Sequence, residues 1–386
     1  MDDRKLHIIE RPELDRLIRL LRAAQFTVIG PTPRDNAIVH GELKSADDLP
    51  VGWSDRQEPG RYQARRAGHD QFFNYVLGPD SWKRCFFPPK LRIFEASRNG
   101  GSQEPFQVEV RRKDPPKYAC LGVRACELAA IAIQDRVMGS ELMDPYYRRA
   151  RDQAFVVAVN CVEPGGTCFC VSMGTGPRCR RDFDLCLTEL DGELGVEVGT
   201  EAGAAFFRQL KSREATASER RLFTLLLDRA CEHMGRKLDA EGLPELLIAS
   251  VESPRWEQIA RRCLVCGNCT MVCPTCFCYN VHDSTDLTGR KAERWRLWGS
   301  CFTLEFSYLG ATTVRTEGYS RYRQWMTHKL SSWHAQFGCS GCVGCGRCIT
   351  WCPVGIDITA EAAAFRQDAA AQAGGVAPRM RPEGAV

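Results

Sequence analysis

The sequence lacks the features that mark membrane, secreted and nucleic-acid-binding proteins. Its longest apolar runs, such as FVVAV at 155–159, are far too short to span a bilayer. The first ten residues, MDDRKLHIIE, have no apolar core of the kind found in signal peptides. The net charge is only +4 over 386 residues, so nothing in the composition demands nucleic acid or an acidic membrane surface. We therefore expect a cytoplasmic protein that binds neither nucleic acid nor membrane.

Nucleotide-binding motifs and histidine clusters are also missing. No G-x-G-x-x-G run follows a strand-like segment, no P-loop is present, and the GTG at 174–176 is too short to count. The seven histidines are scattered along the chain, so a metal site is expected to use another residue type as its ligands.

Cysteine is abundant instead, with 21 residues in the chain. A reducing compartment disfavours a disulfide framework, and the cysteines are clustered, which favours metal binding. Two runs share the pattern C-x2-C-x2-C-x3-C-P. The first ladder is Cys263, Cys266, Cys269 and Cys273, before Pro274, and the second ladder is Cys342, Cys345, Cys348 and Cys352, before Pro353.

This spacing is that of bacterial ferredoxins, in which the fourth cysteine of each run serves the other cluster. The pattern therefore predicts two [4Fe–4S] clusters, with Gly267, Gly344 and Gly346 allowing turns that aim amide groups at the sulfurs. Crossing the fourth ligands assigns cluster one to Cys263, Cys266, Cys269 and Cys352, and cluster two to Cys342, Cys345, Cys348 and Cys273. Structural zinc, which usually uses two separated C-x2-C pairs, fits three consecutive short gaps poorly.

Basic residues near the ladders could offset the negative charge of such clusters. The candidates are Arg261, Arg262, Arg294, Arg296, Arg347 and Lys329, and a solvated basic face is the equally simple alternative for each one.

The remainder of the chain predicts a mixed α/β region. PELDRLIRLLRAA at 12–24 has helical spacing, and FTVIG and AIVHGEL indicate strands. YACLGV, RACELAAIAIQDRV and AFVVAVN indicate a strand–helix–strand unit with a parallel pair. We expect an α/β domain over 1–200, a helical connector over 201–262 and a mostly helical, ferredoxin-like dicluster domain over 263–366. RWRLWGSCFTLEF and YRQWMTHKL should form helices that cover the clusters, and 367–386 should be a flexible tail.

The tetrapeptide TCFC occurs beside the first ladder at 275–278 and again, without a ladder, at 167–170. Cys126, Cys161, Cys168 and Cys170 all fall near the carboxyl ends of predicted parallel strands, where sites form in such units. They could build a third metal site, for which a [4Fe–4S] cluster is the first candidate. The alternative is that these cysteines are small buried hydrophobic residues. Cys276 and Cys278 should pack, or donate weakly to cluster sulfurs, rather than act as ligands.

Several segments outside the ladders carry a family resemblance. They are SWKRCFFPP, CLGVRACELAAIAIQDRV, VAVNCVEPGGTCFCVSMGTGP, CGNCTMVCPTCFC and GCVGCGRCITWCPVGID. Through them the chain resembles the beta subunit of sulfhydrogenases, the soluble NAD(P)-linked nickel–iron hydrogenases. It is also similar to the iron–sulfur relay subunit of anaerobic sulfite reductases.

The resemblance implies an electron-relay subunit that has no catalytic residue of its own. Its partners would be a flavin/NAD(P)H-binding subunit, together with the small and large subunits of the nickel–iron hydrogenase. The chain lacks the paired C-x2-C motifs, one pair near each terminus, of a nickel–iron site. A relay in a sulfite reductase and a redox-sensing, ligand-binding module remain alternatives. The choice of NAD or NADP, the potentials, the direction of electron flow and the stoichiometry are not encoded in any motif.

Overall fold

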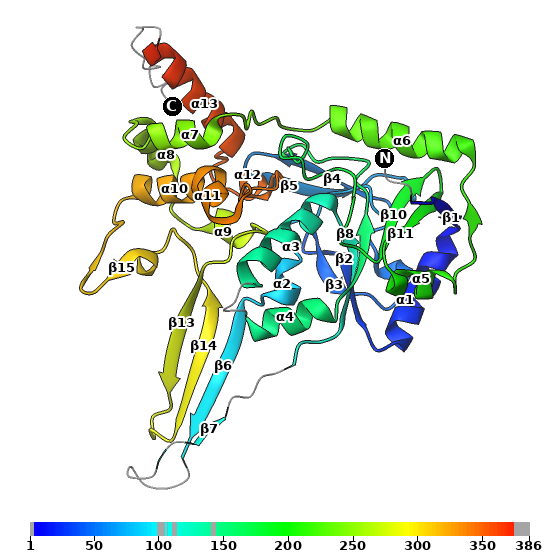
Figure 1. Ribbon diagram of the computed structural model, residues 1–386, viewed down its shortest axis with the longest axis horizontal. Coiled ribbons are helices and arrows are strands. Elements are labelled where there is room, and N and C mark those ends of the chain that lie inside the picture. Colours follow the sequence, from blue (N-terminus) through cyan, green and yellow to red (C-terminus); the bar gives the residue numbers. More distant parts are fainter. Residues whose placement is uncertain (1–3, 99–104, 106, 110–113, 140–143, 374–386) are drawn as a thin grey trace.

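The computed structural model of the chain describes residues 4–98, 105, 107–109, 114–139 and 144–373 (Figure 1). Within them, no helix has both the length and the apolar character needed to cross a membrane.

A mixed eight-stranded sheet forms the centre of the α/β region. Strands β2, β8, β9 and β10 are mutually parallel neighbours, and the outer strands pair antiparallel, in the order β12-β1-β11-β10-β9-β8-β2-β3. The strands are β1 (His7–Ile9), β2 (Thr27–Arg34), β3 (Ala37–Glu42), β8 (Tyr118–Val123), β9 (Phe155–Val159), β10 (Leu185–Leu190), β11 (Glu193–Val198) and β12 (Arg213–Glu214).

Helices cover both faces of this sheet. Successive strand residues point to opposite faces, so Val157 of β9 packs beneath one helical layer and Val156 beneath the other. The first layer is α1 (Arg11–Ala23) and α5 (Glu201–Phe207), and the second is α3 (Ala125–Met138), α4 (Pro145–Asp152) and α6 (Ala217–Glu232). The predicted strand–helix–strand unit is confirmed as β8, α3 and β9.

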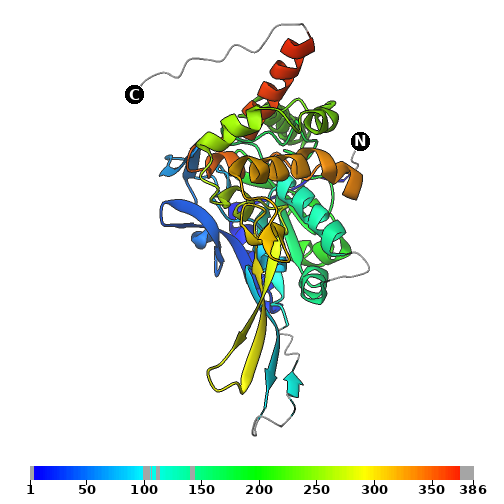
Figure 2. The same ribbon diagram turned by 90° about the vertical axis from the view of Figure 1, so that its left-hand side faces the viewer.

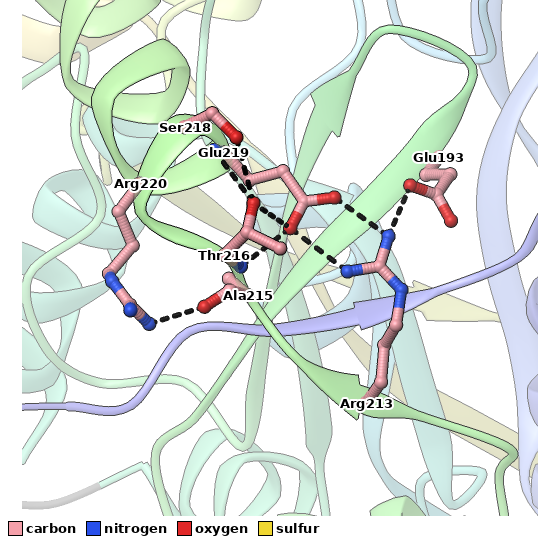
Figure 3. A network of polar contacts seen from close by, with 7 residues as sticks. All are labelled: Glu193, Arg213, Ala215, Thr216, Ser218, Glu219 and Arg220. Atoms are coloured by element: carbon pink, nitrogen blue, oxygen red, sulfur yellow. Dashed lines mark hydrogen bonds and ion pairs between the residues drawn. The ribbon is translucent and has the colours of Figure 1, made fainter.

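The start of α6 is tied to the edge of the sheet by a polar network (Figure 3). Thr216 and Glu219 form a reciprocal capping box at the first turn of α6. Arg213 of β12 donates hydrogen bonds to Glu193 at 2.7 Å and to Glu219 at 2.7 and 2.9 Å. The helix that follows the sheet is thereby fixed at its beginning.

A second sheet crosses the expected domain boundaries and extends away from the rest of the molecule (Figures 1 and 2). Its order is β13-β14-β6-β7, and β14 pairs antiparallel with β6. The strands are β6 (Lys90–Ser97), β7 (Gln107–Glu109), β13 (Tyr279–Thr285) and β14 (Lys291–Trp298). A short hairpin of β4 (Trp53–Glu58) and β5 (Arg61–Arg66), and the pair β15 (Tyr308–Leu309) and β16 (Thr312–Thr313), complete the strands described.

The expectation that the segment between the ladders forms helices is wrong in its first half. Residues 294–298 belong to strand β14, which pairs antiparallel with β6 through a register shift between Arg294 and Trp295. The second half is helical, as expected, in α10 (Gly318–Thr327) and in the π-helical turn η3 (His328–Ser332). The region after residue 263 therefore combines helices with strands.

Short helices surround the ladders. They are α2 (Lys83–Phe86), α7 (Leu243–Ala249), α8 (Arg255–Arg262), α9 (Asn268–Met271), α11 (Trp333–Phe337) and α12 (Arg347–Thr350), with the turn η2 (Glu305–Ser307) and the longer helix α13 (Ile358–Ala373). The turn η1 (Ala46–Asp48) packs against α1 instead.

The expected flexible tail begins later than residue 367. Helix α13 continues to Ala373, and it is held by Phe365, whose ring packs against Trp256 with centroids 4.4 Å apart, and by Asp368, which pairs with Arg255. The remainder of the tail lies outside the described residues. The other domain boundaries stay predictions.

Candidate metal centre

Each ladder ends in a short helix that carries its third cysteine and precedes its fourth. In the first ladder this helix is α9, which holds Cys269, and in the second it is α12, which holds Cys348. Both helices follow a glycine in the left-handed conformation, Gly267 and Gly346, each with φ of 72°. The turns expected at these glycines are confirmed.

The two ladders repeat the same backbone geometry two residues after their first cysteine. Val265 has φ of 55° and Gly344 has φ of 67°. In each ladder this residue's amide donates to the sulfur of the first cysteine, at 3.4 Å to Cys263 Sγ and 3.4 Å to Cys342 Sγ. Amide groups that point at thiolate sulfur stabilise negative charge there. Both ladders are therefore built to hold an anionic group.

The first group of thiols lines one cavity. Its walls include Cys263, Cys266, Cys269 and Cys352, together with apolar side chains such as Phe302 and Trp325. Cys352 comes from the second ladder, and its sulfur accepts a hydrogen bond from the amide of Ile356 at 3.3 Å. Cys352 and Cys266 both act electrostatically on Cys263, in agreement with their place in the same cavity.

The second group brings Cys273 of the first ladder to the second ladder. Cys342, Cys345 and Cys273 are the cysteines that act electrostatically on Cys348. Cys348 also lines the cavity of the first group. The cysteines that interact with it electrostatically nevertheless all belong to the second group. The structure thus brings together both sets of four that the crossed assignment requires.

Among the residues that the structure describes, no three His, Cys, Asp or Glu side chains converge as they would around a single metal ion. A cubane holds its four thiolates around a larger core than one ion does, and the first group lines a cavity of its own. The residues present therefore fit iron–sulfur clusters, with four thiolate donors for each.

Burial and charge act in opposite directions on these thiols. Burial raises the pKa of Cys263, Cys269, Cys345 and Cys348, and raises the pKa of Cys342 to about 12. The pKa of Cys273 is instead well below its usual range, because the thiol of Cys276 hydrogen-bonds to it and Lys329 and Thr275 add to the effect. These contacts favour the thiolate form of Cys273, which is the form of cysteine that binds iron.

Of the six basic residues considered from the sequence, two reach the cysteines. Lys329 donates to Cys273 Sγ at 3.2 Å, and Arg347 lies beside Cys345 while it pairs with the buried Glu127. Three others are paired with carboxylates instead: Arg262 with Glu361, Arg294 with Asp283 and Arg296 with Asp144. Arg261 is exposed.

The sequence analysis did not predict two residues that lie beside the second group of cysteines. Thr275 Oγ1 lies 3.1 Å from Cys273 Sγ and donates to the carbonyl of Gly341 at 2.7 Å. Lys83 of α2 donates to the carbonyl of Cys276 at 3.0 Å, although the two residues are 193 positions apart in the chain. The TCFC repeat was the signal for Thr275, whereas no local pattern marked Lys83.

The first TCFC lies against the second ladder. Phe169 N donates to the carbonyl of Gly344 at 2.8 Å. Thr167 Oγ1 lies 2.6 Å from Thr350 Oγ1, and Gln57 accepts hydrogen bonds from both hydroxyls at 2.9 and 2.8 Å. This contact joins the α/β region to the ladders.

The four cysteines considered for a third site line a single cavity, which also contacts Cys345. Cys168 acts electrostatically with Cys170, Cys161 and Cys345, and Cys126 acts with Cys170 and Cys345. Burial raises the pKa of all four thiols, while Arg124 lowers that of Cys161 and Arg347 lowers that of Cys126. The structure thus brings the four cysteines, with Cys345, to one cavity.

Comparison with known proteins agrees with this geometry. The family model of the 4Fe-4S dicluster domain matches residues 262–356. Sulfhydrogenase 2 subunit beta of Pyrococcus furiosus is 33% identical over 334 residues, which cover 86% of this chain and 89% of that protein. The chain belongs to the sulfhydrogenase beta-subunit family. No solved structure matches it.

Membership of the sulfhydrogenase beta-subunit family bears out the resemblance seen in the sequence. It also supports a role in electron transfer, because the matched domain is one that holds two clusters. The match begins at residue 262 and ends at 356, so it includes both ladders and excludes the first TCFC.

Val265 and Gly344 occupy equivalent positions in the two ladders, but they should tolerate substitution differently. A side chain is already present at Val265, whereas none fits at Gly344. A Cβ atom on Gly344 would lie 2.6 Å from backbone atoms of Phe169, so Gly344→Val should abolish iron binding by the second group. Val265→Gly should keep its iron and change the melting temperature little, because relief of left-handed strain offsets lost packing.

Iron content and the melting temperature of anaerobically purified protein measure both effects. Loss of iron in Val265→Gly, or full iron in Gly344→Val, would contradict the predicted difference in tolerance between the two positions.

Proposed function

We propose that this chain is the electron-relay subunit of an NAD(P)-linked nickel–iron hydrogenase. Electrons would pass through it between a flavin/NAD(P)H-binding subunit on one side and the small and large hydrogenase subunits on the other. The observation that carries the proposal is the exchange of fourth cysteines, with Cys352 beside the first ladder and Cys273 beside the second. The relation to a sulfhydrogenase subunit supports the identity of the complex.

The proposed ligands of cluster one are Cys263, Cys266, Cys269 and Cys352, and those of cluster two are Cys342, Cys345, Cys348 and Cys273. Bound clusters would supply one-electron transfer in a fold arranged like that of a bacterial ferredoxin. The chain's own residues hold the thiolates, direct the amides of Val265, Gly344 and Ile356 at sulfur, and exclude water with Trp325 and Phe302.

We propose a third [4Fe–4S] cluster held by Cys126, Cys161, Cys168 and Cys170. The support is that these four line one cavity although Cys126 comes from α3 and the other three from the loop between β9 and β10. Cys345 borders the same cavity, so the third site would adjoin cluster two. The order along the relay would be the third site, then cluster two, then cluster one.

Cluster one would form the outer end of this relay. Cys266 is exposed, and Leu264 and Val354 beside its cavity are 62% and 41% exposed. Apolar side chains in water beside a ligand are suited to contact with another subunit. We propose this face as the exit toward a partner.

Purification tests the proposed complex. A tagged chain purified anaerobically from its own cells should bring down a flavoprotein together with a nickel–iron large subunit. Recovery of a sirohaem protein in their place would move the relay to sulfite reduction. Recovery of the chain alone with intact clusters would favour the redox-sensing module.

Serine substitution tests the crossed ligands. Cys273→Ser should disturb the cluster of the second ladder, and Cys352→Ser that of the first, because each fourth cysteine lies with the opposite group. Electron paramagnetic resonance of the reduced variants, compared with Cys342→Ser and Cys263→Ser, shows which signal is lost. If Cys273→Ser resembled Cys263→Ser instead of Cys342→Ser, the crossed assignment would be wrong.

Iron counting by native mass spectrometry tests the third site. Two [4Fe–4S] clusters hold about eight iron atoms and a third raises the count to about twelve. The double variant Cys168→Ser/Cys170→Ser should lose about four atoms, whereas Cys231→Ser, at an exposed thiol outside the cavity, should lose none. Only two clusters' worth of iron in the unaltered chain would exclude the third cluster.

A further inference from the structure

Lys329 places a buried ammonium group directly on the second group of cysteines. Its side chain lies in the π-helical turn η3 and is only 3% exposed. The Nζ atom donates to Cys273 Sγ at 3.2 Å, to Thr275 Oγ1 at 3.2 Å and to the carbonyl of Gly341 at 3.3 Å, and it lies 3.6 Å from Cys276 Sγ. Sulfur, hydroxyl and carbonyl groups of the described residues thus surround this ammonium group in place of a carboxylate.

A buried ammonium group needs a negative partner, because burial removes the water that stabilises its charge. The negative charge within reach of Lys329 is that of the thiolates, with Cys273 in direct contact. π-Helical turns are rare and occur often at functional sites. The position of Lys329 on such a turn, in contact with Cys273, therefore indicates a functional role in addition to packing.

A second buried lysine approaches the same loop from the α/β region. Lys83 is 5% exposed, donates to the carbonyl of Cys276 at 3.0 Å, and holds its Nζ 3.8 Å from the ring centroid of Trp298. It contacts the loop and not a sulfur, so its charge acts on Cys273 from further away than that of Lys329.

The first group has no equivalent cation in the part of the chain that the structure describes. The sulfurs of Cys263 and Cys352 accept hydrogen bonds from the backbone amides of Val265 and Ile356. The nearby guanidinium of Arg262 is occupied by Glu361. The positive charge is therefore concentrated at one of the two dicluster sites.

We propose that Lys329 sets the reduction potential of the cluster that Cys273 helps to hold, with Lys83 as a weaker second cation. One-electron reduction by a reduced flavin or a chemical reductant adds one unit of negative charge beside Cys273. A positive charge and an N–H···S hydrogen bond stabilise this added charge, and so raise the potential of that cluster alone. The inference rests on the proposed relay function and its crossed ligands.

The test is an anaerobic redox titration of the full chain with any copurified partners, followed by electron paramagnetic resonance. Lys329→Met should lower the reduction equilibrium constant of one cluster by about tenfold or more, equal to a shift of about 59 mV to more negative potential for one electron. The signal that Cys273→Ser disturbs should be the one that shifts. The signal that Cys352→Ser disturbs should stay unchanged.

Three further variants calibrate the effect. Lys329→Arg keeps the charge and should shift the potential less than Lys329→Met, and Lys83→Met should give a smaller shift in the same direction. Lys44→Met removes an exposed lysine and should give none.

An unchanged midpoint in Lys329→Met with both signals present would overturn the inference. If Lys329→Met fails to retain iron, an unchanged midpoint in Lys83→Met overturns it equally. A wild-type chain without any cluster signal would instead overturn the proposed function itself.

Discussion

The second ladder is held between two copies of the same tetrapeptide, and the rest of the site depends on that contact. The first TCFC hydrogen-bonds to Gly344 through Phe169, and the second reaches Gly341 through Thr275. Glycine is required where the first copy approaches, because a Cβ atom on Gly346 would lie 2.4 Å from the carbonyl oxygen of Thr167. The backbone of the first TCFC can pack directly against the second ladder only because these ladder positions carry no side chain.

The repeat therefore has a structural meaning, although its two copies do different work. The second copy surrounds Cys273 with a hydroxyl, a thiol and the ammonium of Lys329. The first copy turns its own thiols, Cys168 and Cys170, toward a separate cavity that Cys345 also borders. One ladder thus has a proposed cluster site on one side and a second cysteine-lined cavity on the other.

Local spacing in the sequence was sufficient to predict what local geometry dictates. The ladder pattern indicated both groups of four cysteines. Two apolar runs on either side of a segment with helical spacing indicated the β8–α3–β9 unit. It could not place Lys83 or the pairing of β6 with β14, because these contacts join segments that lie far apart in the chain. Val265 also escaped prediction, since a β-branched residue at positive φ is contrary to its usual preference.

Charge compensation differs at the three cysteine groups, and the difference follows from burial. The first group is partly open, with Cys266 exposed, so solvent and backbone amides suffice. The second is buried, and Lys329, Lys83 and Arg347 all lie at it. The third is buried too, with Arg124 and Arg347 beside it, yet Arg347 is shared with Glu127. Because Lys83, Arg124 and the first TCFC all come from the α/β region, that region adds charge and contacts to those that the matched dicluster domain supplies through Lys329 and Arg347.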